Sequence, residues 1–150
     1  MSIKRFEREF KIAIDKSIKA SEKAVRATAI NIFGDIIRKT PVGNPALWKS
    51  TPPPGYSGGQ LRGNWQTTLN APARSAIDRK QKSTDGGASN DVVSKTRNYS
   101  IDSSIFLSNN LPYAERVNNG WSSQAPAKFV EASTLRFNDV LEKIARKERI

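Results

Sequence analysis

The feature that most constrains the fold is a long run of helical apolar spacing at the start of the chain. Apolar side chains recur every three or four residues from residue 3 to residue 39, which is typical of one face of an amphipathic helix. The stripe comprises Phe6, Phe10, Ile14, Ile18, Val25, Ala29, Ile32 and Ile36. Ser2 is a suitable N-cap, and Thr40 precedes Pro41, where helical backbone is disfavoured. The sequence therefore predicts one helix over residues 3–39.

A helix of this length is longer than the domain that it would belong to. It would extend roughly 55 Å at 1.5 Å per residue, whereas a 150-residue domain has a radius of gyration of about 15 Å. The helix should therefore overhang its domain, or break near Gly34 or within residues 21–23. An overhanging apolar stripe needs a partner, which is a first indication of an oligomer. A bent helix packed within one chain is the alternative.

The next feature is a loop over residues 41–63, which is rich in proline and glycine. Loops of this length in a compact domain are usually functional or disordered. Trp48 and Tyr56 are aromatic anchors in it, and a proline-rich segment loses little conformational entropy when it docks. We therefore expect residues 44–60, including Trp48, Pro53 and Tyr56, to contact a neighbouring subunit or partner protein.

The rest of the chain predicts strands followed by a helix. Alternating apolar positions predict a strand over residues 64–71 and a second over residues 103–107. A short helix is expected over about residues 90–97, and a C-terminal helix from Pro126 to about Arg149. The expected fold is α+β, with the N-terminal and C-terminal helices packed on a small antiparallel sheet. One domain, 1–150, then comprises helix 1–40, extended loop 41–63, sheet region 64–125 and helix 126–150.

Residues 105–126 are expected to be the structural centre of the C-terminal half. After the second strand the pattern predicts a turn at Leu111-Pro112, an extended run, and a stop at residues 118–120. Tyr113 and Trp121 should be largely buried, and Gly120 should adopt positive φ. At the exit of the long loop, leucine and tryptophan should anchor the chain while glycine permits a bend. The residues expected to hold the fold together are Leu61, Gly63, Trp65, Pro112, Tyr113, Gly120, Trp121 and Pro126.

Catalytic and metal-binding patterns are absent from the sequence. The chain has no histidine and no cysteine, which removes the commonest general base, thiolate ligands and disulfides. Four aspartates, at positions 78, 85, 91 and 102, match no nuclease spacing and lie in polar stretches where Asp is an ordinary turn residue. We expect no catalytic, metal or cofactor site and no enzyme activity. No signal peptide and no apolar run of about 20 residues for a membrane span are visible.

The chain is strongly basic, with a formal net charge of +11. A basic surface can attract phosphate backbones or acidic protein partners, or can be a solvated helix face. Lys11, Lys19 and Arg26 lie on the polar face of the N-terminal helix, where we expect them to meet acidic protein surface or solvent. A basic nucleic-acid-binding protein is the alternative function.

Four short segments, taken in order, resemble the neck and minor tail proteins of long-tailed bacteriophages. They are TPVG at 40–43, GQLRGNW at 59–65, LSNNLPYA at 107–114 and NGWSSQAP at 119–126. The resemblance covers roughly residues 30–135. This chain departs from the family at TPVGN, where an acidic residue and a threonine are more usual before the glycine. Its proline-rich insert, residues 45–58, is also longer than in the shortest members.

The resemblance implies a structural virion protein of the tail-completion, head–tail joining group. Such proteins form homo-oligomeric rings, commonly hexameric, at the head-proximal end of the tail. They join the tail tube or tail terminator to the head-connector proteins, and DNA passes through the lumen. The expected location is the virion neck, with assembly in the host cytoplasm.

Overall fold

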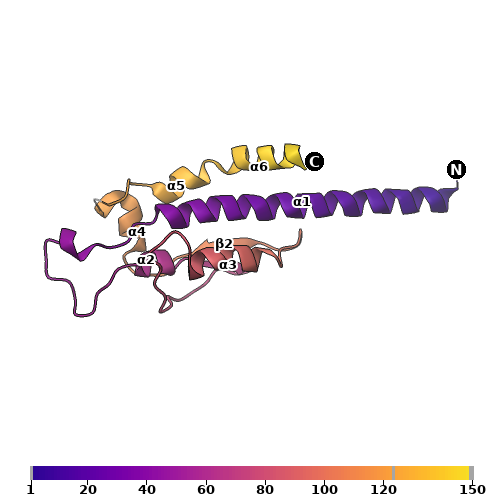
Figure 1. Ribbon diagram of the computed structural model, residues 1–150. Coiled ribbons are helices and arrows are strands. Elements are labelled where there is room, and N and C mark those ends of the chain that lie inside the picture. Colours follow the sequence, from indigo (N-terminus) through magenta and orange to yellow (C-terminus); the bar gives the residue numbers. More distant parts are fainter. Residues whose placement is uncertain (1, 123, 149–150) are drawn as a thin grey trace.

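The computed structural model describes residues 2–122 and 124–148, and it has the mixed helix-and-sheet fold that the sequence predicts. One long helix runs through the molecule and shorter elements surround its C-terminal half (Figure 1). In chain order the elements are α1 (Ile3–Lys39), η1 (Pro45–Leu47), α2 (Gln60–Gly63), β1 (Gln66–Leu69), α3 (Gly87–Thr96), β2 (Ile105–Ser108), α4 (Ala114–Arg116), η2 (Val117–Trp121), α5 (Phe129–Thr134) and α6 (Phe137–Lys147).

Helix α1 has the predicted bounds and runs without a break. The Oγ of Ser2 accepts a hydrogen bond from the Arg5 backbone N–H at 3.2 Å, which caps the first turn. Thr40 adopts extended backbone before Pro41, so the helix ends there. Gly34 stays helical because Ile32, Ile36 and Ile37 around it are buried and packing holds the backbone. The predicted overhang is confirmed, and the alternative of a broken or bent helix is wrong.

The sheet has two antiparallel strands, with Gln66 opposite Ser108 and Leu69 opposite Ile105. Strand β1 is shorter than predicted because Asn70 adopts a left-handed φ of 70°, which asparagine tolerates better than most residues. Helix α3 begins three residues before its predicted start. Its first turn is capped from outside, since the Oε1 of Gln81 accepts the Ala88 N–H at 2.9 Å.

The predicted single C-terminal helix is wrong. Lys128 has a left-handed φ of 61°, so helix α5 starts at Phe129 and not at Pro126. A turn at residues 135–136 then separates α5 from α6. The turn lets the Arg136 guanidinium reach back to Asp35 on α1, at 3.1 Å. The predicted helix end at Arg149 lies outside the described residues.

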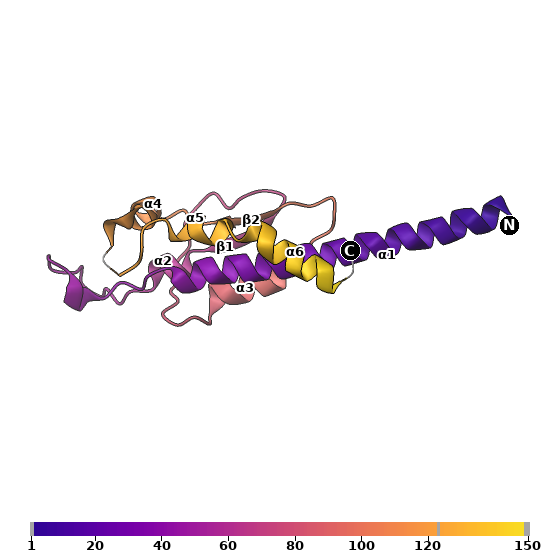
Figure 2. The same ribbon diagram turned by 90° about the horizontal axis from the view of Figure 1, so that it is seen from above.

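The C-terminal half of α1 lies between two groups of elements, with α5 and α6 on one side and α3 with the sheet on the other (Figures 1 and 2). The core forms where these groups meet α1. Its buried members are Ile32, Ile36, Ile37, Trp65, Ala88, Val92, Phe129 and Val140. The long N-terminal helix thus contributes to the core only beyond its midpoint.

Residues after β2 do not run extended as predicted. They form the short helical turns α4 and η2, and Gly120 ends this curl with the positive φ that the sequence predicts, 96°. Val117 packs against the core, whereas Trp121 faces outward and is 76% exposed. The guanidinium of Arg116 lies 5.3 Å from the Trp121 ring centre, so the ring packs on a surface cation. The predicted burial of Trp121 is wrong.

Candidate assembly surfaces

The first candidate surface is the N-terminal overhang of α1, residues 2–17. Every residue in it is exposed. Phe6, Phe10 and Ile14 are 55%, 56% and 42% exposed, and the two phenylalanine rings stack with centres 5.9 Å apart. The overhang projects past α6 and the sheet in both views (Figures 1 and 2). Apolar side chains that project into water do not stabilise the fold, and a group of them commonly marks a surface that binds another protein.

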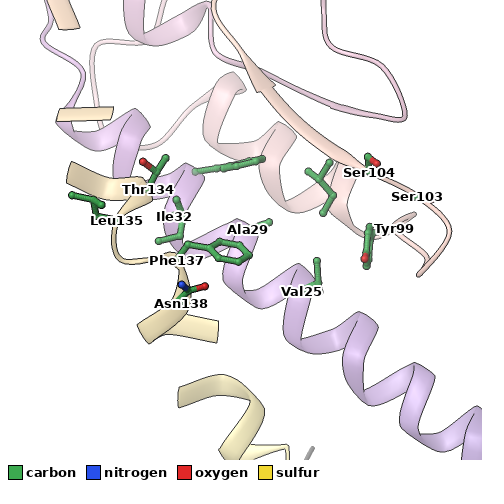
Figure 3. A pocket seen from close by; sticks show the side chains of 12 residues that line it. Val25, Ala29, Ile32, Tyr99, Ser103, Ser104, Thr134, Leu135, Phe137 and Asn138 are labelled. Carbon is green, nitrogen blue, oxygen red and sulfur yellow. The ribbon is translucent and has the colours of Figure 1, made fainter. Parts of the chain in front are cut away.

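The second candidate surface is an apolar groove beside the same helix. It has a volume of about 670 Å³. The described residues that line it are apolar or neutral polar: Val25, Ala29, Ile32, Phe33, Tyr99, Ser103, Ser104, Ile105, Thr134, Leu135, Phe137 and Asn138. Figure 3 shows Leu135 and Phe137 from the C-terminal helices on one side, Tyr99 on the other, and Ala29 of α1 between them.

Two side chains at the groove were not predicted to form a surface: the sequence places Phe137 on the apolar stripe of the predicted C-terminal helix, and Leu135 was not singled out. Leu135 is 84% exposed and Phe137 is 44% exposed. In a continuous C-terminal helix they would belong to ordinary helix faces. The turn between α5 and α6 instead presents both at the edge of the groove. The sequence feature that could have indicated this surface is the pair of apolar residues, Leu135 and Phe137, on either side of Arg136.

The third candidate surface is an aromatic cluster at the other end of the molecule, in the long loop. The rings of Trp48 and Tyr56 have centres 4.6 Å apart and are tilted by 52°. With Pro53 and Tyr113 they line an open pocket of about 340 Å³. Burial and the neighbouring Tyr56 raise the pKa of Tyr113. Tyr113 is still 38% exposed, so the prediction that it is largely buried is wrong, because it forms a pocket wall.

The loop that carries the cluster is attached to the rest of the chain at its base. The side chain of Gln124 donates to the Val42 carbonyl at 2.8 Å and accepts from the Asn44 N–H at 3.3 Å. Gly43 lies close to Tyr56, and a Cβ there would lie 1.8 Å from the tyrosine hydroxyl, so a larger residue would displace the tyrosine ring. The structure therefore holds Trp48, Pro53 and Tyr56 together as a surface.

The GQLRGNW segment joins these surfaces to the core. The Arg62 guanidinium donates to the carbonyls of Thr40 at 2.8 Å, Arg38 at 3.1 Å and Lys82 at 3.0 Å, which caps the C-terminal end of α1. Leu61 and Trp65 are buried as predicted. Gly63 permits a close approach and not a bulge, because a Cβ there would lie 2.3 Å from the Arg79 carbonyl oxygen.

The structural centre therefore lies at residues 59–65, and the segment 105–126 is attached to it. The side-chain amide of Asn109 donates to the Leu61 carbonyl at 2.8 Å. By contrast, Pro112 and Pro126 are exposed. They shape turns at the surface and do not pack in the core.

The three basic residues singled out on α1 have different environments. Lys11 and Lys19 are exposed. Arg26 is partly buried, and its guanidinium donates to the Tyr99 carbonyl at 3.2 Å. Arg26 therefore supports the wall of the apolar groove, whereas Lys11 and Lys19 are available to a partner.

Within residues 2–122 and 124–148, no group of three acidic, histidine or cysteine side chains is placed to hold a metal ion. The helices described there include none that is both long and apolar enough to cross a membrane. The largest ionic cluster surrounds Asp35, which accepts from Ser133 at 2.9 Å and pairs with Lys39, Arg38 and Arg136. This cluster ties α1 to the C-terminal helices.

No protein-family model, curated protein or solved structure matches the chain significantly.

Proposed function

We propose that this protein is a structural subunit of a long-tailed phage virion, a neck protein of the tail-completion or head–tail joining kind. Copies of it form a ring, hexameric in this proposal, at the head-proximal end of the tail. The ring joins the tail tube or tail terminator to the head connector around the DNA path. The protein works by shape and contact, without catalysis.

The observation that carries the proposal is the exposed apolar overhang of α1. A chain of 150 residues that leaves the first 15 residues of its longest helix in solvent is completed by another polypeptide. The aromatic cluster at the opposite end offers a second contact surface. A subunit with separate contact surfaces at its two ends is suited to an assembly that bridges two neighbours.

The four resembling segments support the same proposal, because they form the structural attachments. GQLRGNW caps α1 and buries Trp65, and Asn109 of LSNNLPYA bonds to it. Gln124 of NGWSSQAP bonds to Val42 of TPVG. The segments thus form one connected framework at the base of the long loop.

The test is a phage in which the gene is deleted and supplied in trans. We expect full heads and complete tails that stay unjoined without the protein, and joined virions when it is supplied. Electron microscopy of the neck should then show the protein as a ring. Joined, infectious virions in the absence of the protein would contradict the proposal.

The net charge of +11 favours one second candidate, a nucleic-acid-binding protein. The two candidates differ in salt dependence. Binding to DNA through phosphates should weaken steeply between 50 and 200 mM salt, with a log–log slope of several units. Tight, steeply salt-dependent binding of the isolated chain to duplex DNA, with normal head–tail joining in the deletion phage, would favour this second candidate.

A further inference from the structure

The overhang and the apolar groove lie on one face of α1. With 3.6 residues per turn, Phe10, Ile14 and Ile18 of the N-terminal half point within an arc of about 100° that also contains Val25, Ala29 and Ile32. The first three residues form the apolar stripe, and the last three line the groove. The exposed Glu7 and Lys11 point into the same arc and interrupt the apolar positions near its N-terminal end. The stripe is convex and projects, whereas the groove is hollow. One continuous helix thus carries a projecting ridge in its N-terminal half and borders a groove in its C-terminal half.

We propose that two copies of this chain pair in opposite directions through this face of α1. When a second copy is turned end over end, its stripe lies along the groove of the first, and the first stripe lies along the second groove. Ile14 then lies near Val25 of the other copy, close to the middle of the contact. Each body lies beside the other copy's overhang, where none of the described elements of its own chain stands (Figure 1).

The amount of apolar surface suits such a pair. The exposed side chains that the contact covers are Phe10, Ile14, Leu135 and Phe137, which are 42–84% exposed. Burying them in both copies removes on the order of 1,000 Å² from water, before the groove walls are counted, which approaches the lower end of specific interfaces. The lining of the groove is neutral, so a second apolar helix face fits it better than an anion or a nucleic acid.

The direction of pairing follows from the two surfaces sharing one face. An antiparallel pair covers both stripes and both grooves with two copies and closes on itself, as two-fold interfaces do. A parallel, staggered arrangement leaves an uncovered stripe at one end and an uncovered groove at the other, so it continues to grow. The closed pair is the smaller assembly that satisfies both surfaces.

The consequence for assembly rests on the proposed function. Copies in a head–tail ring all point the same way, whereas the two copies of the pair point in opposite directions. The pair is therefore the free form of the protein, and it separates before copies join the neck. Pairing covers the overhang until a ring site is present.

The absence of cysteine from the sequence makes a direct test simple. The double variant Ile14→Cys/Val25→Cys carries two thiols that are roughly 16 Å apart along one helix, too far for a bond within the chain. Under mild oxidation we expect one covalent species of twice the chain mass. A ladder of larger species would mean staggered growth, and monomer alone would mean no pair. Either result would overturn the proposal.

Two controls fix the face and the direction. Ile12 is 60% exposed but points to the opposite side of the helix from Phe10, so Ile12→Cys/Val25→Cys should cross-link at least tenfold less. Ile14→Cys alone should also cross-link weakly, since efficient linking would indicate an in-register parallel pair and contradict the proposal. For the unmodified contact, Phe10→Glu should raise the dissociation constant of the pair at least tenfold by sedimentation, whereas Ile12→Glu should not.

One further arm separates this inference from the proposed function. Oxidised Ile14→Cys/Val25→Cys protein should fail to join heads to tails in extracts, and reduction should restore joining. If the covalent pair forms but the reduced protein and the wild type both fail to join, the pair stands and the proposed function is wrong. If the oxidised protein joins as well as the reduced one, the pair does not separate before assembly, and that part of the inference is wrong.

Discussion

Trp65 connects the buried core to the C-terminal end of α1. Its ring is 9% exposed in the core, and its indole N–H donates to the Thr40 hydroxyl at 2.7 Å. That hydroxyl donates in turn to the Ile36 carbonyl at 2.7 Å, in the last turn of α1. The side chain thus combines apolar burial with a satisfied hydrogen bond at the point where the long helix ends.

The two tryptophans of the resembling segments should respond very differently to truncation. Trp65→Ala removes a buried ring and should lower the free energy of unfolding by about 3–5 kcal/mol. Trp121→Ala removes a ring that is 76% exposed and should cost less than about 1 kcal/mol. Urea denaturation of both variants checks this, and equal losses would show that Trp121 is buried in solution.

Asp35 should make stability depend on pH in the acid range. Burial alone would raise the pKa of Asp35, but hydrogen bonds from Lys39 and Ser133 and the charges of Lys39 and Arg136 lower it below the usual 3.8. Its ionised form therefore stabilises the fold above that value, and this contribution is lost as pH falls through the lowered pKa.

Asp35→Asn should accordingly destabilise by about 1–3 kcal/mol at neutral pH. The difference from wild type should shrink below pH 4. Urea melts at pH 7, 4 and 3 measure it, with Asp78→Asn as an exposed control. A difference that stays constant down to pH 3 would mean that the carboxylate charge does not matter.

At the scale of elements, the sequence predicted correctly those features that depend only on neighbouring residues in the chain. The bounds of α1 follow from apolar periodicity, an N-cap serine and the proline after Thr40, all within the segment itself. The two strands could also be predicted locally, because apolar and polar residues alternate within each of them. The division into α5 and α6 could not be predicted, because the Arg136–Asp35 contact that the turn permits links residues a hundred positions apart.

The position of the structural centre shows the same limit. Residues 105–126 contain many turn residues, which led to the prediction of a buried hub there. The contacts at 59–65 are instead made by Arg62 with the Thr40 carbonyl, by Asn64 with the Ile77 N–H and by Trp65 with the Thr40 hydroxyl, groups that only the folded chain brings near. Burial of a polar network cannot be read from periodicity. The aromatic loop residues were predicted as a set, but the part of Tyr113 in their pocket was not.

The aromatic cluster of the long loop should matter to assembly and not to folding. Trp48 is 39% exposed, so the cluster contributes little to the core. The free energy of unfolding of the double variant Trp48→Ala/Tyr56→Ala should lie within about 1–2 kcal/mol of the wild-type value. Replacing residues 45–58 by a short flexible linker should likewise leave a folded chain. Both variants should fail to join heads to tails, and functional virions from either would show that the loop contacts no partner.

At the scale of the whole molecule, the chain is elongated, with the N-terminal half of α1 at one end and the loop that carries the aromatic cluster at the other (Figures 1 and 2). The core occupies the part between them, around the C-terminal half of α1. Basic residues outnumber acidic ones, and the formal net charge of the chain is +11. The remaining question at this scale is whether that charge meets protein or DNA.

On the proposed function, we expect the basic face of α1 to meet acidic protein surface, because DNA must pass quickly through a neck channel. A lumen lined by many cations would hold DNA by several kcal/mol through counterion release.

Lys11 and Lys19 are exposed and test this, whereas Arg26 is unsuitable because its contact with the Tyr99 carbonyl supports the fold. Lys11→Glu/Lys19→Glu should therefore weaken binding of the protein to the partners that the proposed function assigns to it, and should reduce head–tail joining. The loss should be largest at low salt, where repulsion is least screened. Joining assays at 50 and 300 mM salt measure it, with Lys11→Gln/Lys19→Gln separating loss of charge from reversal. If joining is unchanged but filled heads retain DNA differently, these lysines face the channel and the prediction is wrong.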